Sequence, residues 1–231
     1  MLYNSANSRM VSDNFTYYWM MIICCYTEIR HEWSEQEFTG KLLLLPASLQ
    51  QPILRKTQWM DRQLSLGGKL LLVEALQQLG KEDLSLADMK YNSYHRPYFE
   101  TGIDFNIAHS GNMVICCVTN NGQIGIDTEQ ITRIDLTEYT DYFTPNEWNI
   151  INNYPNQFAG FYDFWTRKEA VLKAIGTGFH TLLSSIDVSD DNIKYDDLLY
   201  HIRPLDIADG YKSHIATTID PEAVRIIKVD L

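Results

Sequence analysis

The 231-residue chain lacks the features that mark several specialised classes of protein. Its four cysteines form two adjacent pairs, Cys24-Cys25 and Cys116-Cys117, and this number and spacing suit neither a disulfide framework nor a zinc site. We therefore expect reduced cysteines, buried in the core strands of a cytoplasmic protein. The longest apolar run near the start, Trp19 to Tyr26, has eight residues, too few for a membrane span, and it lacks the flanks of a secretory signal. A first β-strand is the better interpretation.

Basic residues are also scarce. The chain has 19 Lys and Arg against 30 Asp and Glu, a formal net charge of −11, so it repels polyphosphate backbones at long range. We expect neither nucleic acid nor a membrane as a partner. An anionic ligand must then be held by a local group of cations or by a metal ion. The 45% hydrophobic and 21% charged residues are ordinary for a globular protein, and the length suits one large domain or two small ones.

Two long helices are predicted from the spacing of apolar residues. These residues recur near the 3.6-residue period over Gln50–Leu79 and over Phe158–Ile175. Each segment is followed by a glycine, Gly80 and Gly176, of the kind that ends a helix. Between them, Thr144 to Glu147 carries the capping-box pattern that begins a shorter helix.

Short strands are predicted around these helices. They are expected at 105–109, 113–119 and 123–128, with edge strands at His214–Thr218 and Val224–Val229. The Asn121-Gly122 step is a strong hairpin signal, so 113–119 and 123–128 are predicted to pair antiparallel. The pattern indicates an α+β protein with two lobes. We expect a flexible extension at 1–18, an N-terminal lobe at 19–103 and a C-terminal lobe at 104–231.

Two acidic residues follow an apolar strand. Asp127 and Glu129 stand two residues apart, so both side chains project from the same face of the strand. Carboxylates that close repel each other unless a cation lies between them, and hard oxygen ligands suit Mg²⁺. The alternative is a strand that runs out into solvent with two exposed acids, and this motif by itself does not exclude it.

The second long helix carries a further charged group. Helical spacing places Trp165, Glu169 and Lys173 on one face. A Glu–Lys pair one turn apart is common on surfaces, but the tryptophan indicates a partly buried face, where such charges need a ligand or a metal. His109 ends a strand and is either functional or merely solvated. No Gly-x-Ser-x-Gly elbow surrounds the neighbouring Ser110, which disfavours a serine hydrolase.

Three segments, taken in order, resemble the signature of the 4′-phosphopantetheinyl transferases. They are Phe105–Gly111, Gly125–Glu129 and Trp165–Lys173. The length is similar to that of the larger, monomeric subclass that activates polyketide and nonribosomal peptide synthetases. The resemblance implies two similar α+β lobes with coenzyme A in the cleft between them and the metal site in the C-terminal lobe. It also implies an enzyme that moves 4′-phosphopantetheine from coenzyme A to a serine of an apo carrier protein and releases adenosine 3′,5′-bisphosphate.

The resemblance extends to individual residues. It implies metal ligands, for Mg²⁺ or for Mn²⁺ in vitro, at Asp127, Glu129 and Glu169. It implies catalytic roles for Glu169, which deprotonates the incoming serine, for Lys173, which neutralises charge on the pyrophosphate, and for Asp127. It implies coenzyme A ligands at His109, Arg96, Lys168 and Lys173.

Two departures from the family pattern affect the phosphate contacts. Ala108 stands where many members have a serine, and Leu49–Pro52 lacks the basic residues expected there. Two other functions remain to be weighed. A non-catalytic module that binds a carrier protein or coenzyme A is disfavoured because it has no need of three converging acids. A metal-dependent phosphoryl transferase of another fold is permitted by Asp127 and Glu129 but disfavoured by the Trp165–Lys173 helix.

Overall fold

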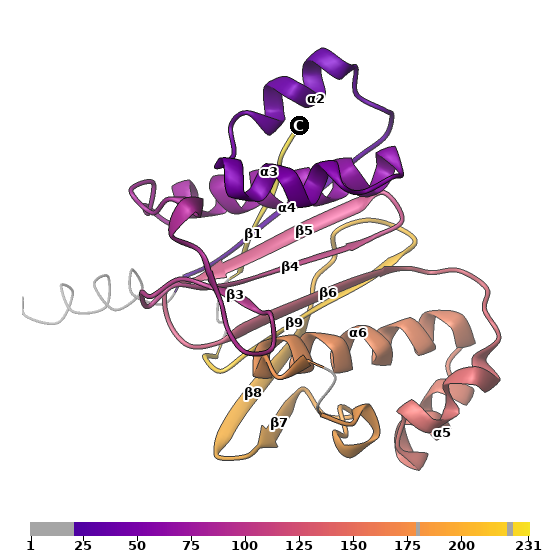
Figure 1. Cartoon of the computed structure of the whole chain (residues 1–231). Helices are drawn as coiled ribbons and strands as arrows, with labels where there is room; N and C mark the ends of the chain where they lie inside the picture. Colours follow the sequence, from indigo (N-terminus) through magenta and orange to yellow (C-terminus); the bar gives the residue numbers. More distant parts are fainter. Residues whose placement is uncertain (1–20, 179–180, 221–223) are drawn as a thin grey trace, which may run out of the picture.

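The computed structural model describes residues 21–178, 181–220 and 224–231, and the extension predicted at 1–18 lies outside this part. Two four-stranded sheets lie between layers of helices (Figure 1). The helices are α2 (Glu35–Leu42), α3 (Ala47–Leu54), α4 (Trp59–Gln78), α5 (Pro145–Asn152) and α6 (Gln157–Ile175), with 3₁₀ turns at Leu86–Asp88, Leu136–Tyr142 and Leu183–Ser185. The strands are β1 (Ile22–Glu28), β2 (Lys90–Tyr91), β3 (Pro97–Tyr98), β4 (Asp104–Ser110), β5 (Met113–Thr119), β6 (Ile124–Gln130), β7 (Asn192–Tyr195), β8 (Leu198–Pro204), β9 (Tyr211–Thr217) and β10 (Val224–Lys228).

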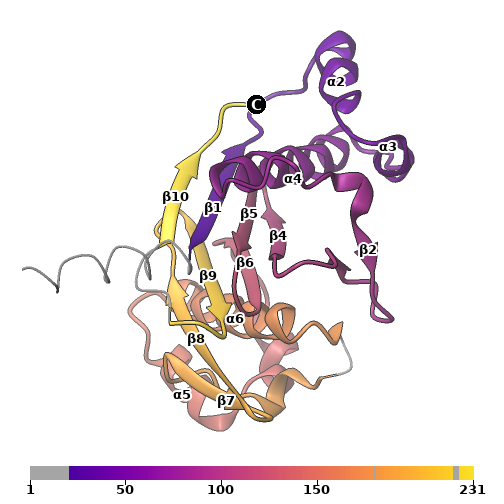
Figure 2. The same cartoon turned by 90° about the vertical axis from the view of Figure 1, so that its left-hand side faces the viewer.

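The first sheet has the strand order β10-β1-β5-β4. Strand β1 is antiparallel to β5 and parallel to β10, which lies beside it at the sheet edge (Figure 2). Side chains alternate across the sheet. Ile23 of β1 and Val114 of β5 belong to the cluster on the outer face, where they pack with Leu71 and Leu72 of α4. Helix α4 therefore buries one face of this sheet.

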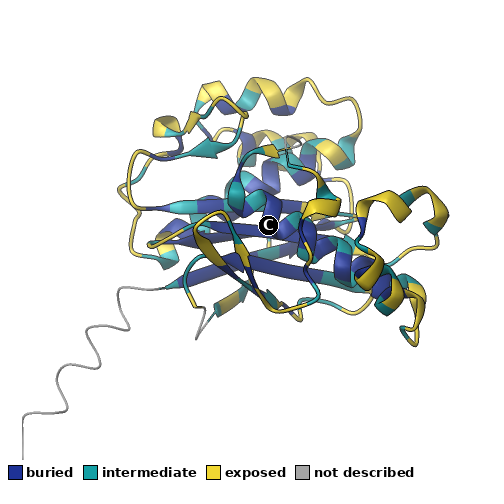
Figure 3. Ribbon diagram, turned by 90° about the horizontal axis from the view of Figure 1, so that it is seen from below, coloured by how far each residue is buried: buried dark blue, intermediate teal, exposed yellow. Residues whose placement is uncertain are grey.

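The second sheet has the order β6-β9-β8-β7 and is antiparallel throughout. Helix α6 covers its outer face, with Val171 and Ala174 packed against Ile202 and Ala216 of the sheet. A third cluster, which includes Ile124 of β6, lies between the two sheets. Buried residues accordingly follow the central strands, whereas exposed residues gather on peripheral helices and loops (Figure 3).

Strands β4 and β6 meet through side chains, because they belong to different sheets. Backbone N–H groups of β6 donate to alternate side chains of β4: Ile124 N to Asp104 Oδ2 (2.8 Å), Ile126 N to Asn106 Oδ1 (3.0 Å) and Gln130 N to Ser110 Oγ (3.1 Å). The intervening position is Ala108, whose methyl group cannot accept a hydrogen bond. These contacts fix how the two halves of the molecule sit side by side.

The ends of the helices were predicted correctly, but one predicted helix is in fact two. Gly80 and Gly176 adopt the left-handed conformation, with φ of +70° and +77°, and Thr144 and Glu147 form the capping box at the start of α5. The single helix predicted over Gln50–Leu79 is two helices, α3 and α4, separated by 55–58. The break lets each helix place its own apolar residues on the core.

The predicted pairing of 113–119 with 123–128 was wrong. Strand β5 pairs with β4 on one side and β1 on the other, so neither edge is open to β6. Asn121-Gly122 does turn the chain, with Gly122 at φ +71°, but it leads β6 into the second sheet, where it pairs with β9. The lobe boundary expected at 103/104 therefore does not coincide with the division between the two sheets. The first sheet takes in β4, β5 and β10, and the second begins at β6.

All four cysteines are buried, as predicted, but the expectation that all four are reduced is wrong for two of them. Cys24 and Cys117 lie opposite each other across β1 and β5 with a Cα–Cα distance of 4.2 Å, and the structure joins them in a disulfide. Cys25 and Cys116 remain free, and burial raises the pKa of Cys25 to about 12. Sequence alone does not align residues 93 positions apart. None of the helices formed by the described residues is long and apolar enough to cross a bilayer.

Candidate functional site

The acidic strand β6 lies directly against helix α6. Gly125 makes this close approach possible, because a Cβ atom there would lie 2.0 Å from the Ala170 carbonyl oxygen and 2.4 Å from the Ala174 nitrogen. Asp127, two residues further along, is 4% exposed and faces the same helix. Burial raises the pKa of Asp127, and the nearby Lys173 charge opposes that rise. The glycine thus brings the helix into contact with a buried carboxylate.

Helix α6 adds Glu169 and Lys173, which stand one turn apart. Lys173 Nζ lies 2.6 Å from Asp127 Oδ1, a short charge-assisted hydrogen bond. Burial raises the pKa of Glu169, and the negative charge of Asp127 raises it further. The second oxygen of Asp127, Oδ2, is buried and has no hydrogen-bond partner among the described residues. A buried carboxylate oxygen in that state needs a proton, a water molecule or a cation.

Glu129 is held from the other half of the molecule. Ser110 Oγ, at the end of β4, donates to Glu129 Oε2 at 2.5 Å and accepts from the Gln130 backbone at 3.1 Å. Burial raises the pKa of Glu129, Ser110 opposes the rise, and the charges of Asp127 and Glu169 add to it. Three carboxylates from two elements therefore act on one another electrostatically.

The donor set fits a hard divalent cation in its chemistry. Carboxylate oxygens are the ligands that Mg²⁺ prefers, and the orphaned Oδ2 of Asp127 is an available donor. As the side chains lie, however, no three His, Cys, Asp or Glu residues within the described ranges converge closely enough to enclose an ion. Lys173 instead occupies the position next to Asp127. A bound cation would share these carboxylates with the lysine.

A group of cations lies beyond the acidic cluster. His109 is exposed at the end of β4. Partial loss of hydration lowers its pKa, and the positive charges of Lys173, Lys56 and Lys69 lower it further. Lys69, on α4, is half-buried, and burial lowers its pKa. Three lysines from both halves therefore lie close enough to His109 to act on it electrostatically, and such a group suits a ligand with several phosphate oxygens.

A pocket of about 270 Å³ opens beside this group. Its walls come from the turn at Tyr94–Pro97, from Asn106 of β4 and from α6, including Glu169 and Lys173. The lining thus combines charged groups with the apolar side chains of Leu172 and Pro97. Such a site suits a ligand with a flat ring and an anionic tail.

The two remaining predicted ligands are engaged elsewhere. Arg96 borders the pocket, but its Nη2 donates to both carboxylate oxygens of Asp104, at 2.9 Å to Oδ1 and 2.8 Å to Oδ2. Lys168 points away from the acidic group: its ammonium is fully buried, lies 2.8 Å from Glu147, and donates to the carbonyls of Leu183 and Ile186. The structure therefore brings together Asp127, Glu129, Glu169, Lys173 and His109, and it leaves Lys168 outside.

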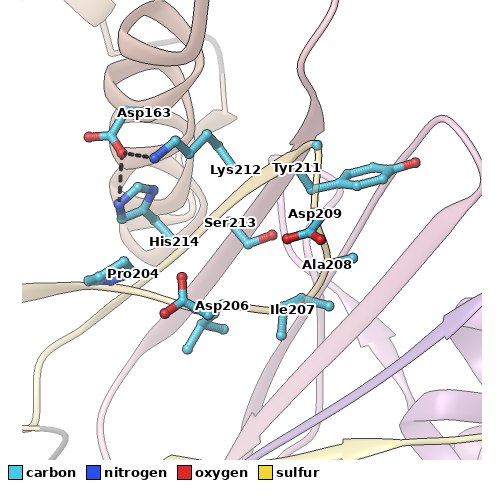
Figure 4. Close-up of a pocket in the computed structure, with 12 residues that line it drawn as sticks. Asp163, Pro204, Asp206, Ile207, Ala208, Asp209, Tyr211, Lys212, Ser213 and His214 are labelled. Atoms are coloured by element: carbon cyan, nitrogen blue, oxygen red, sulfur yellow. Dashed lines mark ion pairs between the residues drawn. The ribbon is translucent and has the colours of Figure 1, made fainter. Parts of the chain in front are cut away.

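A second, larger pocket of about 360 Å³ lies at the start of β9 (Figure 4). There Asp163 of α6 points toward Lys212 and His214, with Asp163 Oδ1 at 3.1 Å from Lys212 Nζ and 4.0 Å from His214 Nε2. Burial lowers the pKa of His214 to about 4. None of the predicted site residues lines this pocket, and Lys212 and Asp163 already pair with each other. We therefore place the site at the smaller pocket.

Sequence reasoning missed the residues that hold the site together. Ser110 was considered only as a nucleophile, yet it orients Glu129. Asp104 and Asn106 were not considered, although they anchor β6. The signal available in the sequence was the alternation of polar residues along 104–110, which a buried strand carries only when those side chains have partners.

Comparison with known proteins gives matches to a family, to individual sequences and to a solved structure. Residues 123–218 match the 4′-phosphopantetheinyl transferase superfamily. The chain is 30% identical over 167 residues to the 4′-phosphopantetheinyl transferase gsp of Aneurinibacillus migulanus, covering 71% of this chain and 70% of that protein. It is 32% identical over 113 residues to the 4′-phosphopantetheinyl transferase Sfp of Bacillus subtilis strain 168, covering 48% and 50%. The crystal structure of Thermotoga maritima holo-[acyl-carrier-protein] synthase aligns with a TM-score of 0.33 and 15% identity over 41% of this chain and 61% of that one.

Proposed function

The chain belongs to the 4′-phosphopantetheinyl transferase superfamily, and on this premise we propose that the acidic group on β6 and α6 is its catalytic centre. The protein transfers 4′-phosphopantetheine from coenzyme A to a serine of an apo carrier protein and releases adenosine 3′,5′-bisphosphate. The observation that carries the proposal is the contact of Lys173 with Asp127, within a group that also holds Glu129 and Glu169.

Asp127, Glu129 and Glu169 would hold Mg²⁺. When bound, such an ion supplies charge compensation and a template for the diphosphate. Support comes from the all-oxygen donor set and from the orphaned Oδ2 of Asp127. Three carboxylates carry more negative charge than one divalent ion offsets, and Lys173 supplies a further positive charge beside them. Mn²⁺ has similar ligand preferences and is the expected substitute in vitro.

Glu169 is the proposed proton acceptor for the incoming serine. The serine oxygen forms its bond to the phosphorus that carries pantetheine, the bridging oxygen leaves with adenosine 3′,5′-bisphosphate, and the serine proton passes to a Glu169 carboxylate oxygen directly or through water. Lys173 stabilises the charge on the pyrophosphate oxygens. The main contribution of the protein is alignment and electrostatic stabilisation, as is usual for transfer at phosphorus.

Coenzyme A would lie between the two halves, with its phosphates toward His109, Lys173, Lys56 and Lys69. The three lysines each act electrostatically on His109, and Lys56 also acts on Lys69. The two lysines on the α3–α4 side would replace the basic residues missing at Leu49–Pro52. We further propose that the protein acts as a cytoplasmic monomer. We also propose that it binds neither nucleic acid nor membranes, because its net charge of −11 repels polyanions outside this local site.

Intact-mass spectrometry of an apo carrier protein provides the test. Incubation with coenzyme A, Mg²⁺ and the enzyme should add the mass of one phosphopantetheine arm. EDTA and Glu169→Ala should each abolish the gain, and excess Mg²⁺ should reverse the effect of EDTA. Glu138→Ala is a matched control, because Glu138 is an exposed acid remote from the pocket, and it should leave the rate unchanged.

Two outcomes would contradict the proposal. Full activity of Glu169→Ala would contradict the roles proposed for Glu169, and full activity in EDTA would contradict the metal requirement. Neither result would contradict the transfer reaction itself. No mass gain on a panel of fatty acid, polyketide and peptidyl carriers, with coenzyme A still bound in calorimetry, would favour the non-catalytic binding module. Asp127→Ala separates the two cases further: in an enzyme it should stop catalysis, whereas a binding module should retain its carrier affinity.

A further inference from the structure

Arg96 lies at the junction of the elements that carry the proposed catalytic groups. It leaves the turn before β3 and reaches three of them at once: Nη2 donates to Asp104 of β4 and to the Ile124 carbonyl of β6 at 2.9 Å, and Nη1 donates to the Ala174 carbonyl of α6 at 3.1 Å. Strand β6 carries Asp127 and Glu129, and helix α6 carries Glu169 and Lys173. One guanidinium therefore touches β4, β6 and α6.

The guanidinium has little left to offer a ligand. The side chains of Arg96 and Asp104 are 15% and 17% exposed, and the Nε–H group of Arg96 is buried and without a partner among the described residues. Asp104 anchors the arginine and also accepts from the Ile124 backbone at 2.8 Å. The pair is thus bonded to both backbone groups of Ile124.

Helix α6 is shaped to receive this side chain. Its last carbonyls carry partial negative charge, which a cation stabilises. Gly176 ends the helix at φ +77°, and a Cβ atom there would lie 2.9 Å from Arg96 Nη1 and 3.0 Å from Arg96 Cδ. The glycine therefore serves the helix end and also leaves room for the arginine against it.

We propose that Arg96 is a positioning residue: anchored by Asp104, it locks the start of β6 and the end of α6 to the first half of the molecule. It thereby sets the distance between the carboxylates on β6 and the groups on α6. The inference rests on the proposed function for the identity of those groups. It replaces the expectation that Arg96 binds coenzyme A.

Kinetics with two co-substrates separate the two roles. 3′-Dephospho-coenzyme A lacks the 3′-phosphate but keeps the adenine and the diphosphate, so it tests a contact with the 3′-phosphate, while the KM for each co-substrate tests any other contact. If Arg96 positions the site, Arg96→Gln should lower kcat about tenfold, the effect of losing about 1.4 kcal/mol of alignment, and by the same factor with either co-substrate. Asp104→Asn should act alike, and the double variant should be no worse than the poorer single variant. Arg96→Lys, which keeps the charge, should recover part of kcat.

Two further measurements isolate positioning from stability and from the proposed function. Arg30→Gln removes an exposed arginine–carboxylate pair and should leave kcat and KM unchanged with either co-substrate. Hydrogen exchange of peptides covering the start of β6 and the end of α6 should accelerate in Arg96→Gln even if no carrier protein accepts phosphopantetheine, so this readout does not depend on the reaction.

The inference is overturned if Arg96→Gln raises the KM for coenzyme A, with or without the same rise for the dephospho form, while kcat is unchanged, because that pattern identifies a ligand contact. It is also overturned if kcat falls only in proportion to the unfolded fraction measured by circular dichroism, or if Asp104→Asn is silent. If the wild-type enzyme transfers nothing but hydrogen exchange changes as expected, the proposed function is refuted and the positioning role of Arg96 still holds.

Discussion

Replacing Gly125 by alanine should disable the enzyme through the helix it contacts. The added Cβ would lie 2.0 Å from the Ala170 carbonyl oxygen, 2.4 Å from the Ala174 nitrogen and 3.0 Å from the Lys173 carbonyl carbon. All three are backbone atoms, so no side chain can swing aside. To restore an ordinary contact of 3.4 Å, α6 must retreat by about 1.4 Å. The 2.6 Å contact between Lys173 and Asp127 would then lengthen to about 4 Å, beyond hydrogen-bonding range.

A displacement of that size at reacting groups costs on the order of 10²-fold in rate, and overpacking costs about 1–3 kcal/mol of stability. Carrier modification followed by intact mass gives the rate, and circular dichroism gives the melting temperature. Gly40→Ala is the matched control. Gly40 lies in α2, and no atom of the described residues lies within 4 Å of an added Cβ, so the variant should keep its rate and gain up to about 1 kcal/mol of stability. A Gly125→Ala enzyme with wild-type rate and melting temperature would refute the reasoning.

Two other residues give predictions that concern stability. Lys168→Met should destabilise the fold by about 3–5 kcal/mol in urea titrations, because it leaves Glu147 buried without its partner, while the KM for coenzyme A stays unchanged; a raised KM with unchanged stability would instead identify a ligand contact. His214 should make the protein acid-sensitive: its pKa is about 4 when folded and 6.5 in the reference state, so the unfolded chain gains the proton first and stability falls from pH 6.5 toward pH 4 by about 3 kcal/mol. His214→Gln should lose that much less over the same range, and an equal loss in both proteins would contradict the assignment.

Local chemistry made part of this fold predictable. The capping box at Thr144 and Glu147, and the glycines that end α4 and α6, are decided by residues within one turn of each other. The same holds for Asp127 and Glu129, whose common face follows from strand alternation. Glu169 and Lys173 follow from the helical period in the same way.

Contacts between distant segments account for what was missed. Asn121-Gly122 specifies a turn, but the partner of β6 depended on β5 having both edges occupied already by β1 and β4. Lys168 is adjacent to Glu169, and only the buried Glu147, 21 positions earlier, shows that it faces another core. The bond between Cys24 and Cys117 likewise requires the register of β1 with β5. Sequence patterns indicate which face of a helix or strand a residue lies on, but not which distant segment packs against that face.

The parallel pairing of β10 with β1 has a consequence for how the chain folds. Strand β10 is the last described strand, yet it completes the sheet begun by the first, and the whole of the second sheet lies between them in sequence. As the protein emerges from a ribosome, β1 keeps one edge uncovered until the chain through β10 has been synthesised. Pairings over such long separations slow folding, and an open strand edge invites association between chains. The step most exposed to aggregation in this protein is therefore the interval before its first sheet can close.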